Sequence, residues 1–344
     1  MDLLRQRLYT QRLTGPPLER PEDVVRLLGA VQSQDYPGAK WSVGQRMSKG
    51  TEAVVDDAFS SGRMLRTHIL RPTWHFVAPD DIRWMLQLTS PRVQTLNAFR
   101  YRQLELDEAL LRRTDGLFAR ALEGGNQLTR AELAAVLRRG GIAAAADRLA
   151  HVVMHAELEG VICSGALRGK QHTYALLEER TPGARTMAGD EALAELTYRF
   201  FSGHGPATPA HYAWWSGLKT ADVRSGIAMN QGHLTSREVS GRTYWLGELS
   251  RSPAKRLQAA AYLLPEFDEA ILGYKDLGWG DEFVPAVLIG GKRAGTWRRT
   301  MGRDEVVVET RLVAELSAAG RRALETAAER YGAFLGRPVA LAHR

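Results

Sequence analysis

The chain has 344 residues, a net charge of +7, 44% hydrophobic residues and 25% charged residues. This length is long for one domain and the composition is globular, so we expect several small units with sizeable cores. No apolar stretch is long enough to span a bilayer and the N-terminal segment lacks a signal-peptide pattern, which predicts a cytoplasmic protein. The single cysteine, Cys163, excludes an internal disulfide and a cysteine-cluster metal site.

Arginine carries most of the positive charge, and its side chain is the one that pairs best with phosphate groups. This excess favours an anionic partner, with nucleic acid as the first candidate. Chains rich in Ala, Arg and Gly can also be basic without any function. Net charge alone therefore favours a nucleic-acid partner only weakly.

Short helices followed by two strands are predicted for the first part of the chain. Prolines and capping residues separate the helices, and β-branched and aromatic residues mark the strands. The expected helices are 3–13, 24–31, 38–47, 52–60, 82–88 and 90–102, and the expected strands are 64–70 and 73–77. Helices followed by a small strand pair are typical of a winged helix.

The same order of elements recurs twice, which predicts a repeat although the copies share little sequence. The second copy has expected helices at 107–123, from 128, and at 145–159, with a hairpin at 161–164 and 173–177. The third has expected helices at 191–201, 209–216 and 220–229, with strands at 234–239 and 242–246. A small β unit follows, with expected strands at 283–289, 294–299 and 305–310 and a closing helix at 316–335.

Two glutamines, Gln32 and Gln34, flank one residue at the point where a helix should end. Pro37 disfavours helix at Tyr36 and so favours an extended run. In a strand, residues i and i+2 point to the same face, so both carboxamides can reach one ligand. The alternative is a polar helix cap and turn, which the spacing alone favours.

The run AVQSQDYPGAKWSVGQRM, residues 30–47, resembles the signature of the AlkZ-like winged-helix DNA glycosylases, in which a Gln-x-Gln element is catalytic. Three further segments resemble the same family in order: LRPTWHFVAPDDIRWML (70–86), TPAHYAWWSGL (208–218) and LLPEFDEAILGYKD (263–276). The resemblance implies an α+β fold with three tandem winged helices and a C-terminal β-barrel. We place their boundaries at 1–106, 107–185, 186–255 and 256–344.

The resemblance implies that Gln32 and Gln34 are the catalytic residues, with Ser33 between them pointing away. One branch of the family has aspartate at the position of Gln34. Because this chain has glutamine there, it resembles the Gln-x-Gln branch, which is associated with bulky adducts and crosslinks. Glutamine is neither acid nor base near neutral pH, so the leaving group must depart without protonation. An N7-alkylated purine meets this condition because it already carries a positive charge. Gln34 would hold the attacking water, Gln32 would orient it, and Asp35 is a candidate base.

Other residues are expected to contact DNA or to support the site. Arg71, Thr73 and His75 share one strand face and are placed near lesion phosphates, with a core histidine as the alternative for His75. The remaining candidates are cations at hairpin tips. For Lys292 and Arg293 the alternative is that they lie on a solvated sheet edge without contacting DNA. These candidates are Arg168 and Lys170 in the second unit and Lys292 and Arg293 in the β unit, and Lys40 is a supporting residue without a Schiff-base role.

Two further pairs of residues receive structural interpretations. His151 and His155 have a spacing that can chelate zinc, but the glutamate of a metalloprotease motif is absent, so no metal is expected. Trp214 and Trp215 are adjacent on an expected helix, which allows only one of them to be fully buried. We assign them to core packing.

The resulting hypothesis is a monofunctional, monomeric, nucleoid-associated DNA glycosylase without a cofactor, which acts on duplex DNA with alkylated or crosslinked purines. A crosslinked base cannot be rotated into a tight pocket, so an open cleft is expected. The rival is a non-enzymatic winged-helix DNA-binding protein or transcription regulator, which should be dimeric and tolerate loss of both glutamines. An RNA-binding protein ranks last, since no aromatic platform motif is present.

Overall fold

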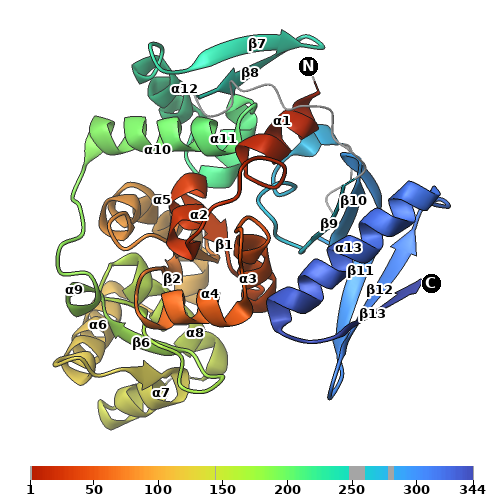
Figure 1. The fold of residues 1–344 in the computed structure, drawn as a ribbon. Helices are drawn as coiled ribbons and strands as arrows, with labels where there is room; N and C mark the ends of the chain where they lie inside the picture. Colours follow the sequence, from red (N-terminus) through yellow and green to blue (C-terminus); the bar gives the residue numbers. More distant parts are fainter. Residues whose placement is uncertain (1, 144, 248–259, 278–282, 344) are drawn as a thin grey trace.

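The first group of elements lies at the centre of the molecule in the computed structural model, which describes residues 2–143, 145–247, 260–277 and 283–343 (Figure 1). Its strands form a three-stranded antiparallel sheet in the order β1-β3-β2, so β1 is an edge strand. The elements are α1 (Leu3–Thr10), α2 (Pro21–Leu28), β1 (Ala30–Gln32), α3 (Tyr36–Gly44), α4 (Glu52–Ser60), β2 (Leu65–His68), β3 (Trp74–Val77) and α5 (Ile82–Gln103).

Several expected bounds in this group differ from the structure, and three of the differences have a local cause or consequence. The helix expected at 24–31 ends at Leu28, because Gly29 adopts a positive φ of 74° and the chain then enters β1. The next helix begins at Tyr36, since Pro37 occupies the first turn, where its missing N–H removes no helix hydrogen bond. The two helices expected at 82–88 and 90–102 are one helix, α5, with Pro91 inside it and buried residues on both sides of the proline.

The second and third groups repeat an order of helices and short strands. In the second, the expected capping box between Thr129 and Glu132 is confirmed, and the strands lie in the order β4-β6-β5. Its elements are α6 (Glu108–Leu122), β4 (Leu128–Thr129), α7 (Arg130–Arg139), α8 (Ala146–Leu158), β5 (Ile162–Ser164), β6 (Thr173–Leu176) and α9 (Leu177–Arg180). The third comprises α10 (Gly189–His204), α11 (Pro209–Ser216), α12 (Thr220–Met229), β7 (Thr235–Val239) and β8 (Arg242–Leu246).

The C-terminal group is an open five-stranded sheet in the order β13-β12-β11-β10-β9, antiparallel except for the parallel β12–β13 pair. The expected β-barrel is therefore wrong for the described residues, since β13 pairs with β12 and not with β9. The apolar residues of this sheet are buried without closure into a barrel, because α13 and the first group pack against it. The elements are β9 (Ala261–Leu264), a 3₁₀ turn (Lys275–Leu277), β10 (Ala286–Ile289), β11 (Lys292–Met301), β12 (Val306–Leu312), α13 (Ala318–Leu335) and β13 (Val339–His343).

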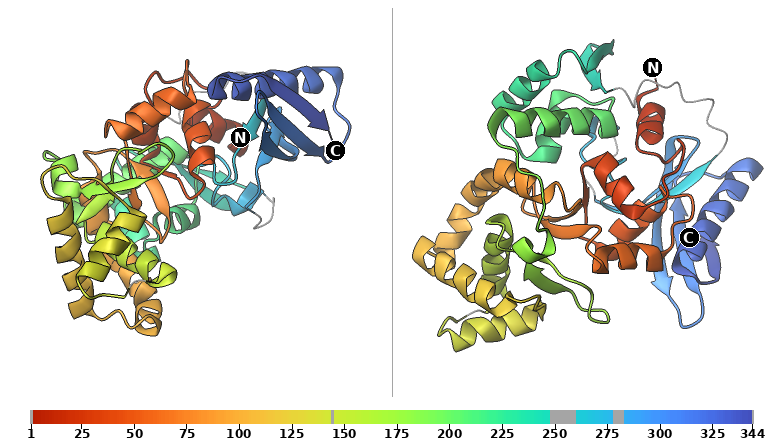
Figure 2. Two further views of the ribbon diagram at one scale, coloured as in Figure 1. Left: turned by 90° about the horizontal axis from the view of Figure 1, so that it is seen from below. Right: turned by 60° about the vertical axis from the view of Figure 1, so that its left-hand side comes forward.

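Hydrophobic cores cross between these groups. One core joins α2, α3 and α4 to the C-terminal sheet and α13, through residues such as Trp41 and Tyr331. A second joins the β1-β3-β2 sheet and α5 to the third group, through residues such as Trp84 and Trp215. The two further views show the first group between its neighbours (Figure 2). The edge strand β1 consequently lies where several parts of the chain meet, while the expected boundary at 255/256 lies outside the described residues.

Candidate active site

The backbone between the two glutamines is held on both sides. The N–H of Ser33 donates to the carbonyl oxygen of Trp74 at 2.7 Å, and the Arg66 guanidinium donates to the Ser33 carbonyl oxygen at 3.1 Å. Ser33 is fully buried, and its hydroxyl accepts a hydrogen bond from Nε of Arg66 at 3.3 Å. These contacts anchor the segment just before the chain turns into α3.

The two glutamine side chains have different environments. Gln32 ends β1 and is 5% exposed, and its Oε1 accepts a hydrogen bond from Nη2 of Arg71 at 2.5 Å. Gln34 lies beyond the strand in a bend and is exposed, and no hydrogen bond joins its side chain to the described residues. The two glutamines therefore do not belong to one strand, and the extended run expected through both of them ends at Gln32. One amide is fixed and the other is available to a ligand.

Arg71 connects Gln32 to an aromatic surface. Its guanidinium carbon lies 4.1 Å from the ring centroid of Trp214, within the range of a cation–π contact. Burial lowers the pKa of Arg71 to about 10, against the opposing charge of Glu269, so the side chain stays protonated at neutral pH. Arg71 is only half-buried and therefore combines a fixed orientation with access to an anion.

His75 is fully buried beside Arg71, where it pairs across the sheet with Gln32. Its Nδ1 lies 3.0 Å from the carbonyl oxygen of Thr73, so this nitrogen carries the proton and Nε2 faces Arg71 at 3.5 Å. Burial, and next the charge of Arg71, holds the pKa of His75 well below its usual value. A neutral, buried imidazole is the arrangement of the core alternative, while the half-buried Thr73 lies beside it.

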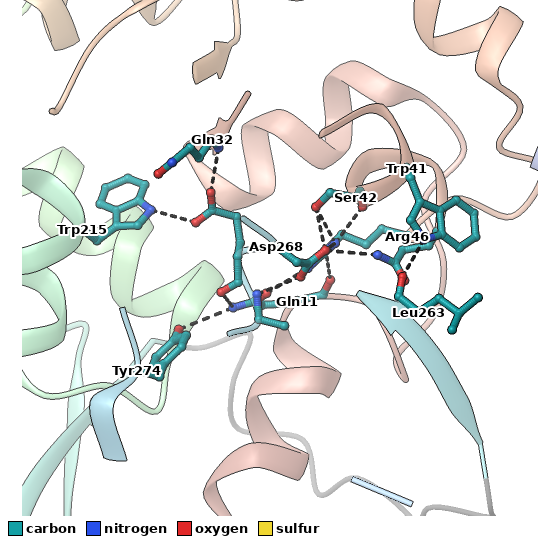
Figure 3. Close-up of polar contacts among 12 residues, drawn as sticks. Gln11, Gln32, Trp41, Ser42, Arg46, Trp215, Leu263, Asp268 and Tyr274 are labelled. Carbon is teal, nitrogen blue, oxygen red and sulfur yellow. Dashed lines mark hydrogen bonds and ion pairs between the residues drawn. The ribbon is translucent and has the colours of Figure 1, made fainter. Parts of the chain in front are cut away.

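A buried acidic residue that was not predicted from the sequence binds the backbone of β1. Glu269 is fully buried, its Oε1 accepts from the Gln32 backbone N–H at 2.8 Å, and its Oε2 accepts from the Trp215 indole N–H at 3.0 Å (Figure 3). Burial raises the pKa of Glu269 to about 7, although the Gln32 hydrogen bond and Arg71 act against this. Two adjacent acidic residues within an apolar run were the available signal, because acidic residues are seldom buried without a specific partner.

Its neighbour Asp268 makes a second buried cluster (Figure 3). Asp268 forms a bidentate ion pair with Arg46 at 2.7 and 2.9 Å and accepts from the Ser42 hydroxyl at 2.7 Å. Although burial opposes it, the Arg46 guanidinium holds the pKa of Asp268 below its usual value. Arg46 also donates to Gln11, which follows α1. The acidic pair thus ties α1, α3, β1 and α11 together.

Asp35 and Lys40 lie on either side of the start of α3. Asp35 precedes the helix, is half-exposed and lies 3.9 Å from Nη2 of Arg299. Lys40 is buried, and its Nζ lies 2.8 Å from Asp56 and 2.9 Å from Glu52. Asp35 consequently stays next to the glutamines, whereas the charge of Lys40 is balanced within the first group.

The hairpin between β5 and β6 reaches the start of α3 through a histidine. Arg168 and Lys170 are exposed at its tip, and Arg168 is already paired with Glu132 at 2.9 Å. The ring of His172 packs edge-on against Tyr36, with 4.5 Å between centroids. This contact brings the second group against the first turn of α3.

The cations of the C-terminal sheet lie elsewhere. Lys292 and Arg293 line a groove of about 440 Å³ together with Leu3 and Asp276, on the α1 side of the molecule. Within the described part of the chain, Gln32 and Arg71 contact neither of them. The structure therefore groups Gln32, Arg71, Thr73 and His75 and leaves the hairpin cations apart from them.

The described residues contain no group of three or more His, Cys, Asp or Glu side chains that could hold a metal ion. His151 contacts the carbonyl oxygen of Asp147 at 2.9 Å, and His155 lies 3.3 Å from Asp115. Within the same part of the chain, no helix has the length and apolar character needed to cross a membrane.

The overall architecture matches a solved DNA glycosylase. The protein "Streptomyces sahachiroi DNA glycosylase AlkZ" superposes with a TM-score of 0.80 at 21% identity, over 99% of this chain and 98% of that one. A search of curated protein sequences gives no match. The family model described as "DNA glycosylase AlkZ-like" matches residues 25–334. The chain therefore belongs to the AlkZ-like DNA glycosylase family, which confirms the resemblance inferred from the sequence and places it among hydrolases that act on DNA.

Proposed function

We propose that the protein is a monofunctional DNA glycosylase that hydrolyses the N-glycosidic bond of N7-alkylated purines in duplex DNA, including bulky adducts and interstrand crosslinks. The observation that carries this proposal is the pair of unlike glutamines, one fixed by Arg71 and one exposed, in a member of a DNA glycosylase family. Gln32 and Gln34 are the catalytic residues. The expected three winged helices, with the boundaries given above, remain part of the proposal and are supported by the order of helices and strands in each group.

The two amides divide the work of positioning water. The Oε1 of Gln32 is occupied by Arg71, so its amide Nε2 is the group left to donate to the water or to a sugar oxygen. The side-chain carbonyl oxygen of Gln34 can accept a hydrogen bond from the water. The same oxygen faces the positive charge that develops on the sugar. Neither amide transfers a proton. The alkylated base keeps the electron pair of the broken glycosidic bond and leaves as a neutral purine, so it needs no proton, and the proton that the attacking water loses as the sugar C1–OH forms passes to the solvent.

Exposure of Gln34 supports an adduct that is not enclosed. A base linked to the opposite strand cannot rotate into a tight pocket, so its enzyme must reach the glycosidic bond from an open surface. The net charge of +7 supports contact with the DNA backbone, with Arg71, Arg168, Lys170, Lys292 and Arg293 as the proposed phosphate contacts. A monomer bound to nucleoid DNA is the expected form of the protein.

The test compares base release from a duplex oligonucleotide with a single N7-methylguanine by the wild type and by Gln34→Ala. We expect release by the wild type and loss of release in the variant with DNA binding retained. Gln231→Ala, which changes an exposed glutamine of the third group, is the matched control. Equal background release from wild type and Gln34→Ala, together with a dimeric protein, would support the DNA-binding regulator instead.

A further inference from the structure

Glu269 is a buried carboxylate without an ion-pair partner. Its side chain is fully buried, and in the described part of the chain no Lys, Arg or His nitrogen lies within 4.0 Å of it, unlike Asp268, whose charge is balanced by Arg46. A buried charge without a counterion is costly, so proteins that keep one use it for a purpose. The two groups that the Glu269 carboxylate contacts indicate its role.

Both contacts of Glu269 are N–H donors. The Gln32 N–H reaches one oxygen at 2.8 Å, and the Trp215 indole N–H reaches the other at 3.0 Å. Because β1 is an edge strand, this backbone N–H has no partner strand on that side, and the carboxylate takes its place. A protonated carboxyl would present an O–H to one of the two N–H groups and lose that hydrogen bond.

We propose that Glu269 is the positioning residue for Gln32 and that base release requires its ionised form. The inference rests on the proposed glycosylase function and deepens it. The ionised carboxylate holds the end of β1 in register, and its negative charge offsets that of Arg71 at a place where the sugar becomes positive during the reaction. The neutral glutamines supply no such charge.

Glu269 is the group in this cluster that titrates near neutral pH. Burial raises the pKa of Glu269 to about 7. The pKa values of the neighbouring acid and phenol shift further from the neutral range, with that of Asp268 lowered and that of Tyr274 raised. The other charged or titratable groups around it come from several elements. They are Arg71 before β3, the neutral His75 in β3, Arg46 on the Asp268 side, and Arg7 and the neutral His204 beside Tyr274.

The test measures single-turnover release of N7-methylguanine by the wild type and Glu269→Gln from about pH 5.5 to 8.5. A group with a pKa of about 7 is about one-tenth ionised at pH 6, so wild-type release should fall about tenfold from pH 8 to pH 6. Glu269→Gln should be slower at pH 8 and lack this fall, with DNA affinity unchanged. Ionisation of the lesion itself is common to both proteins and cancels in the ratio of their rates.

Trp215→Phe provides a second test, because it removes the donor to Oε2 and leaves Glu269 in place. Loss of this hydrogen bond disfavours the carboxylate, so the midpoint of the activity profile should move to higher pH. A purely structural role for Trp215 would lower the rate without moving the midpoint. This readout applies even if Glu269→Gln fails to fold.

Asp276→Asn is the matched control, since Asp276 is a buried carboxylate that pairs with Arg7 at 2.8 Å. We expect it to lower the melting temperature and to leave the pH profile unchanged. The same ratio of wild-type to Glu269→Gln rates at every pH, or an unshifted midpoint in Trp215→Phe, would overturn the inference. Absence of release by the wild type at every pH would instead overturn the proposed function, so the two failures are distinguishable.

Discussion

Replacement of Glu269 by Gln should change how the free energy of unfolding depends on pH. The folded protein raises the pKa of this carboxyl from 4.5 to about 7, which means that the native state binds its proton more tightly than the unfolded chain does. This stabilising contribution is fully present below about pH 4.5 and is lost as the pH rises through about 7. At about 1.4 kcal/mol per pKa unit, the loss is about 3 kcal/mol.

The measurement is urea unfolding of wild type and Glu269→Gln, followed by circular dichroism at several pH values. The unfolding free energy of the wild type minus that of the variant should fall by about 3 kcal/mol between about pH 4.5 and pH 8. The difference isolates Glu269, since every other titrating group is present in both proteins. A difference that stays constant, or rises with pH, would refute a raised pKa for this carboxyl.

Three further variants have expected outcomes. Asp268→Asn leaves Arg46 without a counterion in the core, so thermal or urea unfolding should show a loss of about 3–5 kcal/mol; an unchanged midpoint would contradict this. Arg71→Lys loses the contact with Trp214 and the fixed bond to Gln32, so single-turnover release should slow by about ten- to a hundredfold with smaller effect on affinity. The double variant Arg168→Ala, Lys170→Ala should bind DNA more weakly. In a salt titration, the slope of log affinity against log salt concentration should fall by about two phosphate contacts. An unaltered slope would show that the hairpin does not contact DNA.

Most of the helices could be predicted from the sequence because their signals are local. The capping box at Thr129 and the prolines at the starts of α2 and α11 mark helix ends whatever the rest of the chain does. The open C-terminal sheet could not be predicted in this way. Its topology depends on β13 joining β12 across the intervening helix α13, which is a long-range choice with no local mark.

The site shows the same division. Gln32 and Gln34 were selected through a family resemblance that the family model confirms. Glu269 and the contact between Arg71 and Trp214 were missed, because each joins segments far apart in the sequence. The extended run expected before Pro37 would have placed both glutamines in one strand, whereas β1 ends at Gln32 and Gln34 lies in a bend.

The hydrogen bond between Gln32 and Glu269 spans 237 residues. During synthesis, both glutamines leave the ribosome long before the carboxylate that holds β1, and β1 is an edge strand that lacks this partner until then. A nascent chain, or a fragment cut before residue 263, therefore contains both glutamines but not the acidic pair beneath them. The hydrogen bonds that surround Gln32 are therefore complete only once the C-terminal part of the chain has been made.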